Sequence, residues 1–324
     1  MDVLMAVRLP ALAREELARH FTLHSLSDAP DPEAMLQRLQ PSLRAIATGA
    51  AILAESPHLQ VDQAFLSRFP KLEIVANLGV GYDNIDAKWA AQHNVVVTNT
   101  PDVLTDETAD TAMGLLLNAV REFSAAERYL RAGKWREKPF RLTASLRERT
   151  MGIVGLGRIG KAIARRAEPF GVKIVYHGRN RQADAPYSYY ASLIAMAKDV
   201  DILMVVTPGG EGTRNLVNAD ILEALGPDGI LVNIARGTVV DEPALIEALR
   251  AGRILGAGLD VFGAEPHVPD DFLAMDNVVL LPHVGSGSRH TRDLMNRLVV
   301  ENLVSWAAGS GPVTPVAETP WPPA

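Results

Sequence analysis

Apolar and polar residues follow two periods along the chain, one typical of strands and one typical of helices. In the first hundred residues, short apolar runs suited to buried strands alternate with segments whose apolar residues recur at helical spacing. The strand-like runs are 3–7, 45–47, 73–76 and 95–98, and the helix-like segments are 11–20, 33–39, 63–69 and 85–93. This alternation predicts an α/β fold with a parallel sheet covered by helices on both faces.

The same alternation returns after residue 150, beyond a long helical stretch. Residues 105–130 carry apolar residues at helical spacing and are predicted to form one helix that connects two lobes. Strands are predicted at 173–177, 201–206, 230–234, 258–261 and 278–281, and helices at 192–198, 219–225 and 242–250. The segment 289–307 is predicted to be a helix with Leu294, Leu298, Leu303 and Trp306 facing the core. The proline-rich end, 318–324, is expected to be frayed.

Residues 150–160 read T-M-G-I-V-G-L-G-R-I-G and pass without a break into a helical stretch. In a strand-turn-helix context, Gly155, Gly157 and Gly160 allow a tight turn and the close approach of a pyrophosphate, and the helix N-terminus offers N–H groups to the anion. Glycines of this spacing can also occur in a turn that binds no nucleotide. The flanking strand and helix favour a dinucleotide-binding turn, which also includes Leu156, Arg158 and Ile159.

Composition narrows the class of protein. With 324 residues and 48% hydrophobic content, the chain is long enough for two domains with buried cores. The net charge of -6 provides no basic field for nucleic acid or anionic lipid. The absence of cysteine excludes disulfides, thiolate metal sites and a cysteine nucleophile, and it suits the cytoplasm. No metal site is expected. No apolar run reaches the length of about 18 residues that a membrane span needs.

Six motifs, in order along the chain, resemble those of the D-isomer-specific 2-hydroxyacid dehydrogenases. They are N-L-G-V-G-Y-D-N-I-D from Asn77, V-T-N-T-P-D-V-L-T-D-E-T-A-D from Val97, G-I-V-G-L-G-R-I-G from Gly152, N-I-A-R-G from Asn233, G-L-D-V-F-x-x-E-P from Gly258 and L-P-H-V-G-S from Leu281. Within that family the chain is most similar to the NADPH-dependent glyoxylate/hydroxypyruvate reductases, including those that accept hydroxyphenylpyruvate.

The resemblance implies a two-lobed α/β protein. A Rossmann-type, doubly wound cofactor domain would span residues 99–284, and a flavodoxin-like substrate domain would combine 1–98 with 285–324. A cleft between the lobes and a homodimer are also implied. Asp260 would meet the nicotinamide end of the cofactor, and Ser286 would assist substrate binding. Further cofactor contacts are implied for Thr105, Thr207, the carbonyl of Ile234, His283 and Gly285.

The predicted second strand of the cofactor lobe ends in Gly178, Arg179, Asn180 and Arg181. NAD enzymes place an acid there to hold the ribose 2′-hydroxyl, and that acid repels a 2′-phosphate. Here the acid is missing, and two guanidinium groups suited to phosphate stand in its place. The sequence therefore favours NADP/NADPH, with NADH accepted less well. The alternative is a solvated loop with two surface arginines.

His283 is the predicted proton donor. A residue that titrates near neutrality suits proton transfer, and His283 lies at the C-terminal end of a predicted strand, where parallel sheets open their ligand crevice. Glu265, in the preceding strand-end loop, can orient the ring if the two strands lie close; the resemblance implies that this pair is in contact. The alternative for Glu265 is an exposed loop acid.

Two groups are predicted to hold a substrate carboxylate. Arg236 follows another predicted strand, where a guanidinium can bind a 2-keto carboxylate bidentately and polarise the carbonyl. The glycines around Val80 permit the N–H groups of Val80 and Gly81 to form a small anion nest. Residues 77–84 contain no Lys or Arg, which argues against a phosphorylated substrate.

Two departures from the family pattern leave parts of the site open. Thr207 begins a T-P-G-G run in place of the commoner H-x-P-L-T, so contacts near the adenosine or the pyrophosphate are not fixed. Arg141 stands where some relatives send a Trp into the partner's substrate pocket, and it either favours a polar substrate tail or is solvated.

The predicted activity is reduction of glyoxylate and hydroxypyruvate to glycolate and D-glycerate. One alternative is an arylpyruvate or hydroxyphenylpyruvate reductase. Another is a non-catalytic, nucleotide-sensing binding protein of the same fold. An NAD-dependent D-lactate or phosphoglycerate enzyme would have an acid in place of the two arginines that follow Gly178.

Overall fold

The computed structural model describes residues 1–49 and 60–322, and the chain divides into two compact units. Unit 1 comprises Met1–Leu104 and Ser288–Ala324, and unit 2 comprises Thr105–Gly287. Both boundaries lie slightly later than the 98/99 and 284/285 expected from the sequence. Thr100 exchanges hydrogen bonds with Gly79 of unit 1, and the Gly285 N–H is bound by Asp260 of unit 2. These contacts hold the two connecting segments to their respective units.

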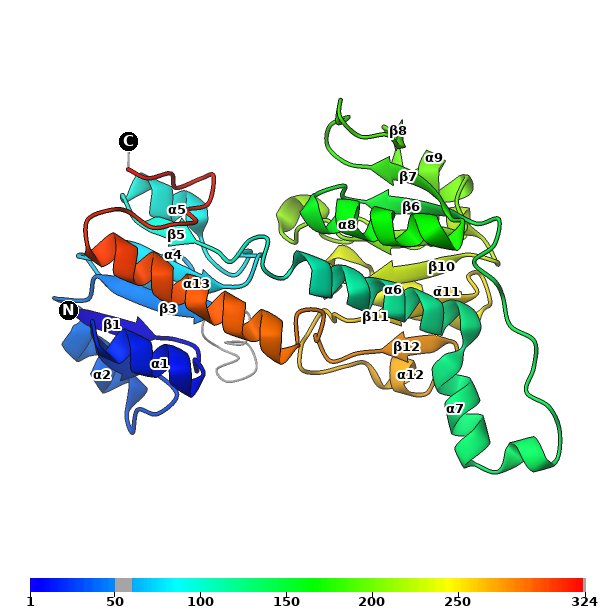
Figure 1. Ribbon diagram of the computed structural model, residues 1–324, viewed down its shortest axis with the longest axis horizontal. Coiled ribbons are helices and arrows are strands. Elements are labelled where there is room, and N and C mark those ends of the chain that lie inside the picture. The colour runs from blue at the N-terminus through cyan, green and yellow to red at the C-terminus, as the bar shows by residue number, and fades with distance from the viewer. Residues whose placement is uncertain (50–59, 323–324) are drawn as a thin grey trace. The chain divides into compact units, whose positions relative to one another are not determined.

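In the described residues, unit 1 contains a parallel five-stranded sheet with the order β2-β1-β3-β4-β5 (Figure 1). The strands are β1 (Asp2–Met5), β2 (Thr22–Ser25), β3 (Ala45–Gly49), β4 (Ile74–Leu78) and β5 (Val96–Thr98). This is the flavodoxin-like order, as predicted. The sequence did not indicate β2, because it is a partly exposed edge strand without an apolar run. Its His24 bonds Asp2 at 2.8 Å.

Most of the helices described in unit 1 begin at a capping side chain, whereas α1 begins after Pro10 without one. They are α1 (Ala11–Ala18), α2 (Pro32–Leu39), α4 (Gln63–Leu66), α5 (Ala87–Gln92) and α13 (Arg289–Ala307). Asp31, Asp62, Asp86 and Ser288 each accept a backbone N–H in the first turn of the helix that follows.

The buried face of α13 is shifted by one position from the predicted face in the first half of the helix. Met295, Val299, Leu303 and Trp306 are buried, whereas Leu294 and Leu298 are only partly buried. The buried residues follow a spacing of three or four, so they form one continuous stripe along the helix. The prediction is therefore right for the last two residues and wrong for the first two.

The proline-rich C-terminal segment is attached to the sheet of unit 1. The Thr319 hydroxyl accepts the Val97 N–H at 2.9 Å and donates to the Val97 carbonyl at 3.2 Å, and Thr319 is buried. The Tyr82 hydroxyl donates to Glu318 at 2.8 Å. Burial and this hydrogen bond raise the pKa of Tyr82 to about 12, so the phenol remains a donor at neutral pH. The expectation of a frayed end is wrong at these residues.

Unit 2 contains, in its described residues, a parallel seven-stranded sheet with the order β12-β11-β10-β9-β6-β7-β8. This doubly wound order confirms the Rossmann-type prediction. The strands are β6 (Thr150–Val154), β7 (Lys173–His177), β8 (Ser188–Tyr190), β9 (Ile202–Val205), β10 (Ile230–Asn233), β11 (Gly256–Leu259) and β12 (Val278–Leu280). The short edge strand β8 was not predicted, because it is polar and pairs only through three residues of β7.

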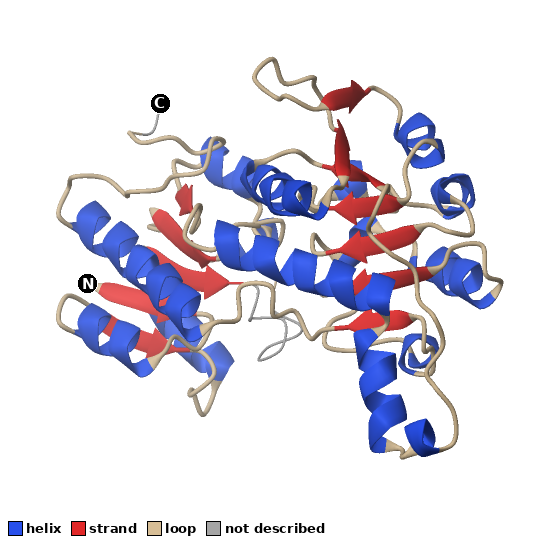
Figure 2. Ribbon diagram, turned by 45° about the vertical axis from the view of Figure 1, so that its right-hand side comes forward, coloured by secondary structure: helices blue, strands red, loops and turns tan. Residues whose placement is uncertain are grey.

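Helices lie on both faces of this sheet and enclose an apolar core on each face (Figure 2). They are α6 (Thr105–Arg121), α7 (Phe123–Arg131), α8 (Arg158–Ala167), α9 (Leu193–Lys198), α10 (Ala219–Leu225), α11 (Glu242–Arg250) and α12 (Asp270–Leu273). Short 3-10 turns are η1 (Lys134–Arg136), η2 (Glu168–Phe170), η3 (Glu211–Thr213) and η4 (Gly237–Val239). The core fixes the strand ends from which the candidate site residues extend.

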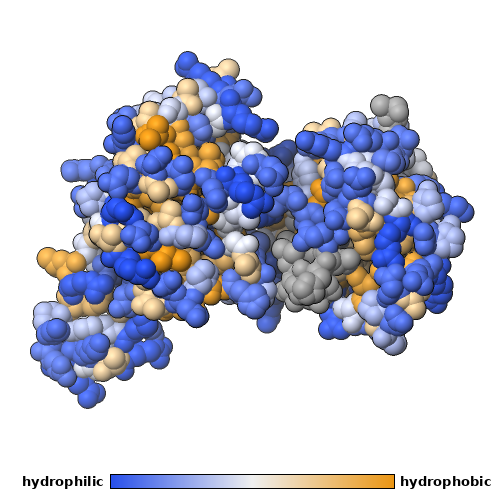
Figure 3. All heavy atoms as spheres, turned by 180° about the vertical axis from the view of Figure 1, so that it is seen from behind, coloured by the Kyte–Doolittle hydropathy of each residue, from blue (hydrophilic) through white to orange (hydrophobic). Residues whose placement is uncertain are grey.

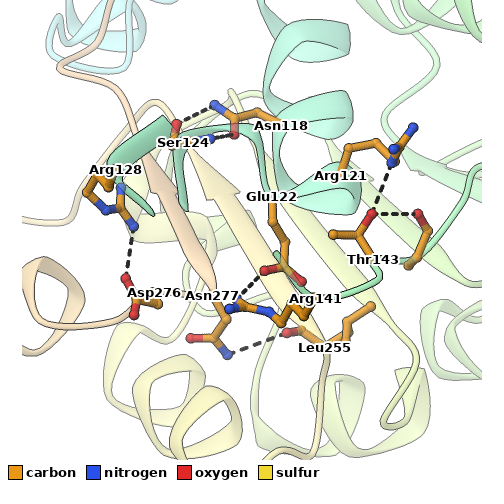
Figure 4. A network of polar contacts seen from close by, with 11 residues as sticks. Asn118, Arg121, Glu122, Ser124, Arg128, Arg141, Thr143, Leu255, Asp276 and Asn277 are labelled. Carbon is orange, nitrogen blue, oxygen red and sulfur yellow. Dashed lines mark hydrogen bonds and ion pairs between the residues drawn. The ribbon is translucent and has the colours of Figure 1, made fainter. Parts of the chain in front are cut away.

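The predicted helix over 105–130 is interrupted at Glu122. This residue has a φ of 52°, in the left-handed region, which ends α6 and begins α7 in a new direction. The Asn118 side chain stabilises the break, since its Oδ1 accepts the Ser124 N–H at 2.9 Å and its Nδ2 donates to the Ser124 hydroxyl at 2.8 Å (Figure 4). Periodicity alone does not reveal this interruption, because apolar residues continue on both sides of it.

The surface of unit 2 mixes hydrophilic side chains with apolar patches (Figure 3). Several large apolar residues of the segment 123–143 are exposed, with 67% of Trp135 and 98% of Leu142 accessible. Within the described part of the chain, no helix has the length and apolarity that crossing a bilayer requires.

Candidate active site

The glycine turn between β6 and α8 has the geometry of a dinucleotide cradle. Gly155 has a φ of 101°, and a Cβ on it would lie 2.9 Å from the Thr207 main chain. A Cβ on Gly160 would lie 2.4 Å from the Gly155 carbonyl oxygen, so a side chain there would separate helix from strand. At Gly157 a Cβ would meet nothing within 4 Å, and no side chain caps α8. The turn therefore fits a pyrophosphate at the helix N-terminus.

The arginine-bearing loop after β7 is fastened next to this turn. Gln182 donates its side-chain N–H to the Leu156 carbonyl at 2.7 Å, and its main-chain N–H bonds the Tyr176 hydroxyl at 2.8 Å. The Tyr189 hydroxyl donates to the Gly178 carbonyl at 3.1 Å. Between these anchors lie exposed side chains, those of Arg179, Asn180 and Arg181. Gln182 was not identified from the sequence, and its contacts place two guanidinium-bearing positions beside the glycine turn.

His283 and Glu265 are in direct contact. The His283 Nδ1 lies 2.7 Å from the Glu265 Oε2, and the other carboxylate oxygen accepts the Phe262 N–H at 2.9 Å. Burial by itself would raise the pKa of Glu265, but the hydrogen bond and charge of His283, the Phe262 N–H and the charge of Arg236 together lower it below its ordinary value. Glu265 is therefore an ionised partner that can hold a proton on Nδ1.

Asp260 holds the turn that carries His283. Its two carboxylate oxygens accept the Val284 N–H at 2.7 Å and the Gly285 N–H at 2.8 Å, and its carbonyl accepts the His283 N–H at 2.8 Å. Burial raises the pKa of Asp260 above its ordinary value, although the two N–H groups and His283 partly offset this effect. Its implied contact with nicotinamide remains a prediction, and the structure adds a positioning role that the sequence did not indicate.

Arg236 is positioned by two residues that sequence reasoning missed. The Asn233 Oδ1 accepts the Ala235 N–H at 3.0 Å and its Nδ2 donates to the Arg236 carbonyl at 3.0 Å, which folds the turn after β10. A Cβ on Gly237 would lie 1.9 Å from the Phe262 carbonyl carbon, so only glycine lets this turn approach the loop that leads to Glu265. In the sequence, the N-x-x-R-G pattern is the feature that could have identified these two residues.

Glu242, at the start of α11, adds a further carboxylate near Glu265. Its Oε1 accepts the Gly263 N–H at 2.8 Å. Burial and repulsion by Glu265 raise the pKa of Glu242, although the Gly263 N–H opposes the shift. The charge of Glu265 acts on the other two carboxylates, because it also raises the pKa of Asp260.

The remaining predicted residues lie at strand ends, helix starts or loops. In unit 2, Thr105 is the first residue of α6, Thr207 follows β9, Ile234 follows β10, and Ser286 is half-buried near the end of the unit. Val80 and Gly81 belong to unit 1, in the loop after β4. Arg141 pairs with Glu122 and lies over the Phe140 ring at 5.0 Å from its centroid.

The chain is similar to known dehydrogenases in both sequence and structure. A model of the "D-isomer specific 2-hydroxyacid dehydrogenase, NAD binding domain" matches residues 113–285. Glyoxylate/hydroxypyruvate reductase A of Arabidopsis thaliana is 43% identical over 98% of this chain and 99% of its own length. Hydroxyphenylpyruvate reductase of Plectranthus scutellarioides is 41% identical with the same coverage. The NADPH-dependent glyoxylate/hydroxypyruvate reductase of Sinorhizobium meliloti, solved with NADP and malonate, is 47% identical with a TM-score of 0.90, over 98% of this chain and 97% of that one.

The raised pKa of Glu242 predicts the pH dependence of the Glu242→Gln variant. Because the folded-state pKa lies above the ordinary 4.5, the group's contribution to stability is complete below that value and is lost as pH rises through the folded pKa. Glutamine keeps an oxygen for the Gly263 N–H and carries no charge. The melting temperature of the variant relative to the wild type should therefore increase from about pH 5 to about pH 8.

Glu247→Gln, at an exposed position of the same helix, controls for the loss of one negative charge. If the difference in melting temperature between Glu242→Gln and the wild type is constant with pH, or falls as pH rises, the pKa of Glu242 is not raised in the folded protein.

Proposed function

Because the chain belongs to the D-isomer-specific 2-hydroxyacid dehydrogenase family, we propose that it reduces small 2-keto acids, glyoxylate and hydroxypyruvate, to 2-hydroxy acids with NADPH. The observation that carries this proposal is the 2.7 Å contact of His283 with Glu265, whose pKa is lowered in part by the charge of Arg236. The products would be glycolate and D-glycerate. Relatives that share almost the whole length and are named glyoxylate/hydroxypyruvate reductases support the substrate class.

The reaction divides into tasks for named residues. NADPH, when bound, supplies the hydride that reduces the carbonyl carbon. The His283 Nε2–H donates the proton to the carbonyl oxygen, since Nδ1 is engaged by Glu265. Glu265 fixes the orientation of the ring through its contact with Nδ1. Arg236 binds the substrate carboxylate bidentately. In unit 1, the N–H groups of Val80 and Gly81 offer a backbone nest for an anion.

A second candidate substrate class is the arylpyruvates. It is favoured by the hydroxyphenylpyruvate reductase of Plectranthus scutellarioides, which matches this chain over nearly its full length. The same residues would perform the chemistry, and the two candidates differ only in the group that the pocket accepts beyond the carbonyl.

Turnover of a panel of 2-keto acids with NADPH tests the proposal. We expect glyoxylate and hydroxypyruvate to have a higher kcat/KM than pyruvate, 3-phosphohydroxypyruvate or an arylpyruvate. His283→Gln should lower kcat by about 10² to 10⁴, the usual contribution of a general acid, with the Kd for NADPH unchanged.

An arylpyruvate preferred by more than about tenfold, roughly 1.4 kcal/mol of transition-state stabilisation, would favour the second candidate. Binding of NADPH without turnover of any 2-keto acid would instead indicate a nucleotide-sensing protein. Near-normal kcat in the His283→Gln variant would contradict the role assigned to this residue.

Preference for NADPH over NADH is proposed from the exposed guanidinium groups of Arg179 and Arg181 beside the glycine turn. Arg179→Ala should lower kcat/KM for NADPH by about tenfold or more, because a hydrogen bond to a charged phosphate contributes about 1.5 to 3 kcal/mol. NADH is the internal control, since it lacks the 2′-phosphate and its kcat/KM should change little. Equal losses with both cofactors would show that the arginine does not recognise the phosphate.

A homodimer is proposed with the segment 123–143 as its contact surface, supported by the exposure of 67% of Trp135 and 98% of Leu142. The double variant Trp135→Ser/Leu142→Ser should shift the protein from dimer to monomer in sedimentation velocity. Leu273→Ser is the matched control, because Leu273 is 62% exposed in α12 outside that segment. A monomeric wild type, or a double variant that stays dimeric, would refute the proposed interface.

A further inference from the structure

Two asparagine side chains hold the loop after β4 by its carbonyl groups. The Asn77 Nδ2 donates to the Gly79 carbonyl at 3.1 Å and to the Gly81 carbonyl at 2.9 Å. The Asn99 Nδ2 donates to the intervening Val80 carbonyl at 2.9 Å. Three consecutive carbonyls are therefore occupied by side-chain amides from within unit 1.

The N–H groups of the same loop differ from its carbonyls in their hydrogen bonding. The Gly79 N–H is bound to the Thr100 hydroxyl at 3.1 Å. Over residues 1–49 and 60–322, the N–H groups of Val80 and Gly81 have no hydrogen-bond acceptor. Two adjacent donors without an acceptor are what an anion requires from a backbone nest.

The orientation of the Asn77 amide follows from its surroundings. Asn77 is fully buried, and its NH₂ group faces two carbonyl oxygens, which can only accept hydrogen bonds. The opposite orientation would place the Oδ1 against both carbonyls. In the observed one, Oδ1 has no partner among the described residues, so the side chain forgoes one hydrogen bond to hold the loop.

Asn99 is itself fixed by the C-terminal part of unit 1. Its carbonyl accepts the Thr314 hydroxyl at 2.6 Å, and its N–H donates to the Thr314 carbonyl at 3.3 Å. The buried Asn302 of α13 bonds Thr314 through both its amide oxygen and its amide nitrogen, each at 2.9 Å. The position of the Asn99 side chain is therefore set by residues more than two hundred positions away, and this restraint extends to the Val80 carbonyl.

We propose that Asn77 and Asn99 are positioning residues for binding of the substrate carboxylate. By engaging the carbonyls of residues 79–81, they keep the Val80 and Gly81 N–H groups directed away from the protein interior and available to one anionic oxygen pair. Neither side chain needs to touch the substrate. The inference rests on the proposed function, because it assumes that the ligand of this loop is the carboxylate of a 2-keto acid.

Steady-state kinetics of full-length variants test the inference. Asn99→Asp and Asn99→Leu both remove the donor to the Val80 carbonyl, and only the first adds a charge. Both should raise KM for the best 2-keto acid, and Ki for the inert dicarboxylate oxalate, by about tenfold with a smaller change in kcat. The Kd for NADPH, which depends on unit 2, should be unchanged. Asn77→Leu should have the same effect or a larger one.

Asn118→Leu is the matched control, because it removes an asparagine amide that contacts Ser124 in unit 2 and does not contact this loop. An increase in KM and Ki confined to the loop variants supports the inference. If Asn77→Leu fails to fold, the two Asn99 variants decide the question. Unchanged KM and Ki in both Asn99 variants would overturn the inference while leaving the proposed function intact. A wild type that turns over no 2-keto acid would refute the proposed function and, with it, this role.

Discussion

The carboxylate of Asp260 is the interaction on which the histidine side of the site depends. It is 2% exposed, and each of its oxygens accepts one N–H of the turn that follows His283. A buried carboxylate without such donors would be strongly destabilising, and the turn without the carboxylate would leave buried N–H groups unsatisfied. The N–H groups of the turn satisfy the carboxylate, and the carboxylate satisfies the N–H groups. This mutual hydrogen bonding sets the position from which the His283 ring reaches Glu265.

The same physical solution recurs at the ends of β10 and β4, where an asparagine replaces the aspartate. Asn233 is 1% exposed and folds the turn that carries Arg236, and Asn77, fully buried, folds the turn that carries Val80 and Gly81. An amide suits these places because it can donate to carbonyls, whereas a carboxylate suits the end of β11 because the groups to be held there are N–H donors.

Charge in unit 2 is arranged so that one carboxylate is ionised more readily than its neighbours. Burial raises the pKa of Glu242 and of Asp260, and the N–H groups that bind them compensate only in part. Glu265 is also buried, but its side-chain contact with His283 and the charge of Arg236 lower its pKa. At Glu265 the hydrogen bond and charge of His283, the Phe262 N–H and the charge of Arg236 together outweigh desolvation, whereas at Asp260 the two N–H groups and the charge of His283 do not. The consequence is a single preferred ionised partner for the histidine ring.

The elements predicted most accurately are those that can be identified from their own local sequence. Buried parallel strands such as β7 and β10, and the helices α10 and α11, carry the apolar pattern and caps that define them locally. The edge strands β2 and β8 were missed because they are short and partly exposed. The break at Glu122 was missed because a side-chain bond from Asn118 to Ser124, rather than a change in periodicity, stabilises it.

Local sequence patterns were enough to identify the fold class, the glycine turn, the missing acid after β7 and the residue types available for proton transfer and carboxylate binding. These features follow from local patterns, since a turn or a strand end restricts which residues fit. Other contacts became known only from the tertiary structure: Asp260 binds the turn after His283, Thr314 restrains Asn99, and Thr319 binds Val97. The reason is that a hydrogen bond requires its donor–acceptor distance to be correct to within a few tenths of an ångström, and spacing along the sequence does not give the distance between residues far apart in the chain.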